Sequence, residues 1–156
     1  MKKIAVVRIR GNIGLPRPVK DTLKKLRLYK ANYCAILPNT PEAIGMLDRV
    51  KDYVTWGEVD SETIKSLLNA RGRLPSNKPL QEEYMKEKTK MSIDEFSKSL
   101  IEGKKSFKDV PGLKPFFRLK PPTGGFERKG IKKQYSLGGS LGYRREKMND
   151  LIKKMI

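Results

Sequence analysis

Three features of this sequence contain residue types that can do chemistry: a glycine-bounded loop, a pair of carboxylates and a cysteine. Gly11-Asn12-Ile13-Gly14 follows an apolar stretch, as a phosphate-binding loop follows a strand. It lacks the third glycine of a dinucleotide fingerprint and the Gly-Lys-Ser/Thr of a triphosphate loop, so a connecting turn is the better interpretation. Asp48 and Asp52 have the spacing of helix neighbours that could share a metal. The basic residues beside them favour a solvated face of mixed charge instead.

The cysteine offers little support for nucleophilic or metal chemistry. Cys34 is the only cysteine and the chain has no histidine. Disulfides, Cys/His zinc sites and His-dependent nucleophiles are therefore excluded. Cys34 lies in an apolar run, where a small buried side chain is expected rather than a reactive thiol. Acidic residues are too thinly spread for the carboxylate cluster of a nuclease. We predict a protein that is not an enzyme and has no cofactor, metal or small-molecule substrate.

Positive charge is the dominant feature of the composition. The chain has 35 Lys and Arg against 17 Asp and Glu, a net charge of +18. A thermophile surface enriches Glu together with Lys, so an imbalance of this size indicates a polyanionic partner instead. No run approaches the roughly 18 apolar residues of a membrane span, and none resembles a signal-peptide core. We therefore expect nucleic acid rather than a membrane as the partner, and a cytoplasmic location.

The charge is concentrated in two blocks. Residues 1–80 carry sixteen basic and seven acidic side chains, whereas residues 81–103 carry four and six. Residues 104–145 carry twelve basic and only two acidic side chains. Two basic blocks around a nearly neutral spacer argue against a uniformly charged, solvated shell.

The first block has the pattern of an α+β core. Apolar runs bounded by Gly or Pro predict strands over residues 4–10, 33–37 and 53–56. Helical spacing predicts three helices, whose starts are marked by Pro18, by Thr40 before Pro41, and by Asp60 or Ser61. We predict a β-α-β-α-β core with a following helix over residues 1–75, large enough to fold alone. Trp56, at the end of the third strand, is equally compatible with the core and with stacking on RNA.

A C-terminal extension over residues 76–156 follows this core. Its helical spacer, residues 79–103, contains a capping box from Ser92 to Glu95. Residues 104–143 form a basic segment rich in Pro and Gly, which is expected to bury little and to stay mobile until RNA orders it. A terminal helix is predicted within residues 144–156, most clearly over 147–155.

Aromatic and basic residues alternate through the basic segment and the start of the last helix. The rings are Phe116, Phe117, Phe126, Tyr135 and Tyr143. The predicted RNA-binding residues here are Arg118, Lys120, Arg128, Lys129, Lys132, Lys133, Tyr135, Arg144 and Arg145. Cations neutralise phosphates, and rings or guanidinium planes stack on unpaired bases. A flexible basic tail without a specific role is the alternative. The glycines of residues 138–142 are expected to form turns that let the backbone approach RNA closely.

Several stretches resemble the L-thirty family of large-subunit ribosomal proteins, which is called L-seven in eukaryotes. They are Val7-Arg8-Ile9-Arg10-Gly11, Thr22-Leu23-Lys24-Lys25-Leu26-Arg27-Leu28, Asn39-Thr40-Pro41-Glu42-Ala43-Ile44-Gly45-Met46-Leu47 and Val50-Lys51-Asp52-Tyr53-Val54-Thr55-Trp56-Gly57. Residues 113–125 and Gly138-Gly139-Ser140-Leu141-Gly142 resemble its archaeal and eukaryotic branch. The archaeal form is the closer match, because the long basic N-terminal arm of the eukaryotic members is not seen.

The resemblance implies both a fold and a partner. The fold is a three-stranded antiparallel sheet with helices on one face, a relative of the ferredoxin-like arrangement. The partners are large-subunit ribosomal RNA, near the 5S RNA, and neighbouring ribosomal proteins. The RNA-facing positions carried over from the family are Arg8, Arg10, Arg17, Asn39 and Arg49. A general DNA- or chromatin-binding protein and an RNA-modifying accessory protein remain the alternative functions.

Side-chain alternation gives separate support for two of these positions. Arg8 and Arg10 lie on one face of the first predicted strand, because successive side chains of a strand point to opposite faces. Burying two unpaired guanidinium groups would be prohibitively costly. We therefore expect both side chains to project toward RNA.

Overall fold

The structure, a computed structural model, describes residues 2–156, which form an α+β fold as the sequence predicted. Its strands are β1 (Lys3–Arg8), β2 (Tyr33–Pro38), β3 (Val54–Glu58), β4 (Phe116–Arg118) and β5 (Gly142–Tyr143). Its helices are α1 (Arg17–Lys25), α2 (Pro41–Val50), α3 (Ser61–Arg71), α4 (Glu82–Thr89), α5 (Ile93–Ile101) and α6 (Lys147–Met155). Short 3₁₀ turns lie at Pro75–Asn77, Phe107–Asp109 and Tyr135–Leu137.

Local capping determines where three of the helices begin. The side chain of Thr40 accepts a backbone hydrogen bond at 3.3 Å at the start of α2, and that of Asp60 accepts one at 2.8 Å at the start of α3. Ser92 and Glu95 form both hydrogen bonds of a capping box before α5. These contacts satisfy amides that have no partner within their own helix, so the predicted starts are confirmed.

The β-sheet is larger than the family resemblance implied. β1 pairs antiparallel with both β2 and β3, so three antiparallel strands lie at its centre. β4 adds antiparallel to β2 and β5 adds parallel to β3, which gives a mixed five-stranded sheet in the order β4-β2-β1-β3-β5. The predicted three antiparallel strands are therefore present, but as the centre of a larger sheet whose two edge strands come from the C-terminal extension. The C-terminal segment supplies one strand to each edge and pairs backbone groups that would otherwise be open there.

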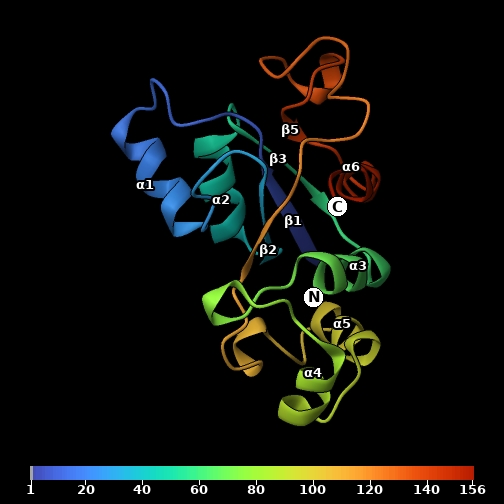
Figure 1. Ribbon diagram of the computed structural model, residues 1–156. Coiled ribbons are helices and arrows are strands. Elements are labelled where there is room, and N and C mark those ends of the chain that lie inside the picture. Colours follow the sequence, from blue (N-terminus) through green and yellow to red (C-terminus); the bar gives the residue numbers. More distant parts are fainter. Residues whose placement is uncertain (1) are drawn as a thin grey trace.

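Both faces of the sheet are covered (Figure 1). Ile4 and Val6 of β1 pack with α1 and α2, whereas Ala5 and Val7 pack with α3, α5 and α6. Burial on two sides explains why residues 4–7 form a continuous apolar run rather than an alternating pattern. The resemblance implied helices on a single face. That description fits α1 and α2 only, because α3 and the C-terminal extension cover the other face.

The basic Pro- and Gly-rich segment contributes to the core. Four of its apolar side chains belong to the cluster under α3 and α6: Val110, Leu113, Phe117 and Leu119. Beyond β4 the chain reaches the end of α6, where the Lys120 amide donates to the Met155 carbonyl at 2.9 Å. The expectation that this segment buries little is therefore wrong. Its apolar residues escape a periodicity search because they come from irregular backbone. Independent folding of residues 1–75 stays a prediction.

The close packing of α6 on β3 requires a glycine. A Cβ on Gly57 would lie 2.8 Å from the Met148 Cβ and would overlap the backbone carbonyl of Arg145. We expect Gly57→Ala to lower the free energy of unfolding by about 1 to 3 kcal/mol, measured by urea denaturation.

Gly45 provides the matched control for this substitution. It lies inside α2, and a Cβ there would meet no heavy atom within 4 Å. Gly45→Ala should raise stability by about 0.5 to 1 kcal/mol, because glycine loses more backbone entropy in a helix than alanine does. If Gly57→Ala leaves the free energy of unfolding unchanged while Gly45→Ala raises it, the packing of α6 on β3 is contradicted.

Candidate RNA interface

Most of the cations that the sequence predicted to contact RNA are exposed, and so is Asn39. Within residues 2–156 none of these exposed cations forms an ion pair with an acidic side chain. They are Arg17, Arg49, Arg118, Lys120, Arg128, Lys129, Lys132, Lys133 and Arg145. Their charges are therefore available to a polyanion outside the chain.

Sheet register determines which of these groups lie together. Because β2 and β3 run antiparallel to β1, both begin at the end of the sheet where β1 finishes. Arg10 follows β1 at this end, and Arg118 of β4 lies opposite Tyr33 at the start of β2. The loop of residues 120–141 extends beyond β5 at the top of Figure 1, drawn in orange. Asn39 follows β2 at the opposite end of the sheet, so it stands apart from this group.

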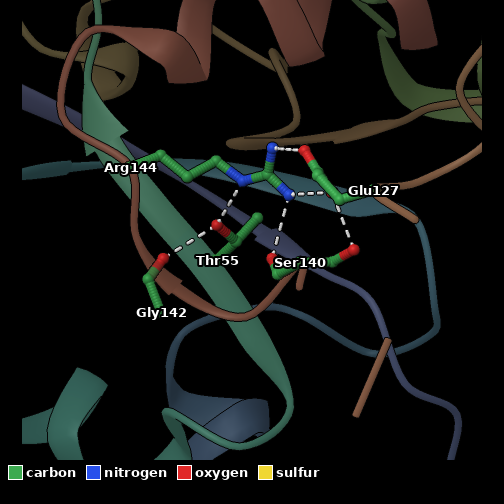
Figure 2. A network of polar contacts seen from close by, with 5 residues as sticks. All are labelled: Thr55, Glu127, Ser140, Gly142 and Arg144. Carbon is green, nitrogen blue, oxygen red and sulfur yellow. Dashed lines mark hydrogen bonds and ion pairs between the residues drawn. The ribbon is translucent and has the colours of Figure 1, made fainter. Parts of the chain in front are cut away.

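Arg144 does not belong to the exposed set, because it is only 4% exposed. Figure 2 shows its guanidinium group between Glu127 and Ser140 of the loop and Thr55 of β3. It forms an ion pair with Glu127, its Nε donates to Thr55 Oγ1 at 2.8 Å and its Nη2 donates to the Ser140 carbonyl at 2.9 Å. The prediction that Arg144 contacts RNA is therefore wrong, since all three of its nitrogens are bonded within the protein.

Further contacts close the loop around Arg144. Thr55 Oγ1 donates to the Gly142 carbonyl at 2.8 Å, and the Ser140 hydroxyl donates to Glu127 at 2.7 Å. The Arg144 guanidinium also lies 4.8 Å from the centroid of the Tyr135 ring. Tyr135 was predicted to stack on RNA, and one face of its ring already meets this cation. All of these bonds are made within the chain and join the loop to β3. Mobility of the segment in the absence of RNA stays a prediction.

The glycines of this loop permit close approach of the chain to itself. A Cβ on Gly139 would lie 2.7 Å from the Lys133 Cβ and would overlap the Lys133 carbonyl. Gly142 adopts a φ of 85°, and a Cβ there would overlap the Gln134 side chain. The sequence predicted that these glycines let the backbone approach RNA. The close contacts found here are with residues of the same loop.

Both acidic residues of the second basic block have internal partners. Asp109 accepts a hydrogen bond from the Ser106 amide at 2.7 Å at the start of a 3₁₀ turn, and Glu127 is paired with Arg144. Burial alone would raise the pKa of the Glu127 carboxyl, but the hydrogen bonds from Arg144 and Ser140 outweigh it and lower the pKa. Within residues 2–156, neither acid forms an ion pair with an exposed cation of this block.

Arg8 is the second predicted contact that the structure buries. Its side chain is 1% exposed, and it donates to the Leu28 carbonyl at 2.8 Å, the Arg10 carbonyl at 2.9 Å and Asn12 Oδ1 at 2.5 Å. Burial lowers the pKa of the Arg8 guanidinium, which still remains protonated. The expectation that it projects toward RNA is wrong, because neutral oxygen acceptors satisfy the buried cation. Arg8 instead holds two loops against the end of β1.

Two further side chains that the sequence singled out, Arg10 and Trp56, are only half-buried. The Arg10 guanidinium lies 5.0 Å from the centroid of the Tyr53 ring and donates to the Asp52 carbonyl at 3.3 Å. Trp56 packs at the margin of the core under α1 and α2, with its ring centroid 6.4 Å from that of Tyr143. Arg10 therefore keeps part of its surface available to a partner, and Trp56 packs against the core.

Sequence reasoning missed the structural role of Glu127 and an aromatic cluster at the edge of the sheet. Glu127 is the only acidic residue in residues 110–145, which was the available signal for a buried partner of a cation. The cluster consists of Tyr29, Tyr33 and Phe116, whose ring centroids lie 5.5 to 6.5 Å apart. Tyr29 and Tyr33 are close in sequence, but Phe116 reaches them only through the pairing of β4 with β2, so no local pattern reveals the cluster.

Metal-ligand clusters and the cysteine thiol are the two kinds of reactive group that can be assessed in the described residues. Across residues 2–156 no cluster of three or more His, Cys, Asp or Glu could hold a metal ion. Burial raises the pKa of the Cys34 thiol to about 12, so the thiolate that would act as a nucleophile is scarce. No helix in this part of the chain is long and apolar enough to cross a membrane.

Comparison with known proteins identifies the family. The family model described as ribosomal protein L30p/L7e matches residues 4–54. A protein of Nanoarchaeum equitans named large ribosomal subunit protein uL30 is 49% identical over 156 residues, which is all of both chains. The uL30 protein of Archaeoglobus fulgidus is 51% identical over 152 residues, which is 97% of this chain and 98% of its own. That of Methanococcus maripaludis strain S2 is 49% identical with the same coverage.

The chain belongs to the uL30 family.

Membership extends over the C-terminal half as well. The L30p/L7e model ends at residue 54, whereas the archaeal uL30 proteins align through the loop and α6. The resemblance to the archaeal form is thereby confirmed, and the Arg144 network lies in the part shared with these archaeal members.

The buried position of Arg8 leads to a direct test. We expect Arg8→Ala to lower the free energy of unfolding by about 2 to 3 kcal/mol, because it removes three hydrogen bonds from a charged donor. Arg10→Ala should cost only about 0.5 to 1 kcal/mol, since it removes a partly exposed cation–π contact. Urea denaturation of both variants measures the difference. Equal stability of the two variants would contradict a structural role for Arg8.

Acid titration tests the Glu127 pair. Its pKa is lowered from an ordinary 4.5, so its contribution is present above about pH 4.5 and is lost as the pH falls through the lowered pKa. At pH 7 we expect Glu127→Gln to cost about 1 to 3 kcal/mol in the free energy of unfolding. The gap between variant and wild type should close as the pH falls below 4.5 and Glu127 becomes protonated.

Glu146→Gln is the control, because Glu146 is exposed and has no ion pair within the described residues. At pH 7 its unfolding free energy should lie within about 0.5 kcal/mol of that of the wild type, as for an ordinary surface substitution. A Glu127→Gln gap that does not change with pH would contradict the assignment of the pair.

Proposed function

We infer that this chain is a structural constituent of the large ribosomal subunit that supports translation in the cytoplasm and has no catalytic activity. The observation that carries this conclusion is alignment along essentially the whole chain with archaeal proteins named as large ribosomal subunit protein uL30. The net charge of +18 agrees with this role, because a protein with such an excess is stabilised by a polyanionic partner.

We propose further that the chain binds large-subunit ribosomal RNA through its exposed cations. Support comes from the lack of ion pairs, within residues 2–156, for the exposed cations among the proposed contacts. The internal partners of both acids of the second basic block add to it. The proposed contacts are Arg10, Arg17, Asn39, Arg49, Arg118, Lys120, Arg128, Lys129, Lys132, Lys133, Tyr135 and Arg145. Arg8 and Arg144 hold the backbone that displays these groups.

We also propose a position near the 5S RNA, beside neighbouring ribosomal proteins. The support for this position is the family resemblance of residues 7–57. Sedimentation of a cell lysate at moderate salt tests the assignment to the large subunit. Crosslinking within the same subunit fraction tests the position, because a neighbour of 5S RNA must crosslink to it. Sedimentation with the nucleoid would contradict the ribosomal assignment and favour a general DNA-binding protein.

Binding to ribosomal RNA should depend steeply on salt, because each neutralised phosphate releases counterions. With on the order of six such phosphates, affinity should fall about 10³-fold between 50 and 200 mM salt. The salt slope is the change in the logarithm of affinity with the logarithm of salt concentration. Replacing Lys129, Lys132 and Lys133 of the loop with Ala should make this slope shallower by about 0.7 to 0.9 for each phosphate that is no longer neutralised.

The spacer offers a control that removes the same charge. Lys86, Lys88 and Lys98 are exposed cations of α4 and α5, in the nearly neutral part of the chain. Replacing them with Ala should leave the slope within experimental error of wild type. Equal slopes for the two triple variants would contradict a specific interface at the loop.

A further inference from the structure

Three aromatic side chains form a cluster at the β4 edge of the sheet. The rings of Tyr33 and Phe116 are nearly parallel, with centroids 5.5 Å apart and an angle of 8° between their planes. The Tyr29 ring stands almost perpendicular to both, at 88° to Tyr33 and 80° to Phe116. The Arg118 guanidinium lies 6.0 Å from the Tyr33 centroid. The cluster therefore combines three aromatic rings in mutual contact with an adjacent cation.

The register of β2 and β4 brings these groups together. Arg118 lies opposite Tyr33, and Phe116 lies opposite Ala35, so all three side chains share the face of the sheet that bears α1 and α2. The intervening Phe117 points to the other face, where it is fully buried. Tyr29 reaches the cluster from the loop after α1. The four residues therefore line a sheet face beside the helices.

Exposure distinguishes the cluster from ordinary core packing. Tyr29 is 44% exposed, Tyr33 and Phe116 are half-buried and Arg118 is exposed. A large aromatic side chain gains most from burial, so an aromatic group left open in this way marks an interaction surface. An aromatic sheet face beside cations is also how several RNA-binding modules stack unpaired bases.

The local charge indicates the occupant. Residues 22–41, which include Tyr29 and Tyr33, contain Lys24, Lys25, Arg27 and Lys30 and no acidic residue. Residues 110–126, which include Phe116 and Arg118, contain Lys114, Arg118 and Lys120 and again no acidic residue. Both segments that build the cluster are thus free of acid over 17 residues or more. Two cationic runs of this kind attract a phosphate backbone and disfavour a basic polypeptide.

We propose that Tyr29, Tyr33, Phe116 and Arg118 form a stacking site for an unpaired RNA base, which rests on the RNA binding proposed above. The base lies on the exposed Tyr29 ring. Edge-to-face contacts with Tyr33 and Phe116 hold that ring in position. Arg118 contacts the phosphate of the same or the adjoining nucleotide. Such a site selects single-stranded RNA, because the bases of a duplex are stacked on one another and unavailable.

Binding of the full chain to an unstructured oligouridylate of about 10 nucleotides, compared with an RNA duplex of equal length, tests the site. Tyr29→Leu should weaken single-strand binding by about 5- to 150-fold, the cost of losing one base–aromatic stack. Its affinity for the duplex and the salt slope should not change, because no charge is removed. Arg118→Ala should reduce the salt slope by about 0.7, as expected when one phosphate of a single strand is no longer neutralised.

Two variants control for folding and for general aromatic effects. Tyr29→Phe keeps the ring and should retain single-strand binding. Tyr84→Leu removes a half-buried ring of α4, in the nearly neutral spacer, and should also leave it unchanged. Thermal unfolding of each variant shows whether the fold is intact. Wild-type single-strand affinity in Tyr29→Leu would overturn the stacking site, as would an equal loss of duplex binding.

The outcomes for the stacking site and for the proposed function can be separated. If wild-type protein binds ribosomal RNA and joins the large subunit while Tyr29→Leu keeps full single-strand affinity, only the stacking site fails. If Tyr29→Leu keeps that affinity but leaves the subunit, the cluster contacts a protein and the stacking site is again overturned. If wild-type protein binds no ribosomal RNA, the proposed RNA binding itself fails.

Discussion

The burial of the Arg144 guanidinium is the constraint on which the C-terminal half of the structure depends. A cation at 4% exposure is tolerated only when oxygen acceptors surround it, and here these come from Glu127, Ser140 and Thr55. Meeting this requirement brings residues 127–140 against β3 and places Gly142 where β5 can pair. The chain then enters α6 directly beside Gly57, where no larger residue fits. Loop, edge strand and terminal helix are thus coupled through one side chain.

Arg8 is buried under the same physical requirement, but without a carboxylate. Its three bonds go to two backbone carbonyls and an asparagine side chain, so the buried charge is dispersed over neutral dipoles. Arginine suits both positions because its planar group offers five donors in fixed directions and does not lose its proton. In a chain with a net charge of +18, two of its cations act inside the fold. Arg8 and Arg144 position the loops that carry exposed cations.

This division between buried and exposed cations affects how the protein meets RNA. Because the Arg144 network joins the loop to β3, we expect the loop lysines to lose less conformational entropy on binding RNA than those of a disordered tail. Mutual repulsion among those lysines is resisted by the hydrogen bonds beneath them and is relieved when phosphates bind. The aromatic cluster at the β4 edge adds a surface that can recognise bases beside groups that recognise charge. Both features depend on strands that the C-terminal segment contributes.

The sequence alone determined the features that depend on local composition and spacing. Charge excess indicated a polyanionic partner, absence of histidine excluded most catalytic chemistry, and Thr40, Asp60 and Ser92 marked helix starts because capping acts within one turn. Only the tertiary structure decided which cations are exposed. Thr55 and Arg144 are 89 residues apart in sequence, and Arg8 bonds to a carbonyl 20 residues away. The sequence around a buried arginine looks the same as that around an arginine that faces RNA. The two differ only in their acceptors, which the fold brings from distant parts of the chain.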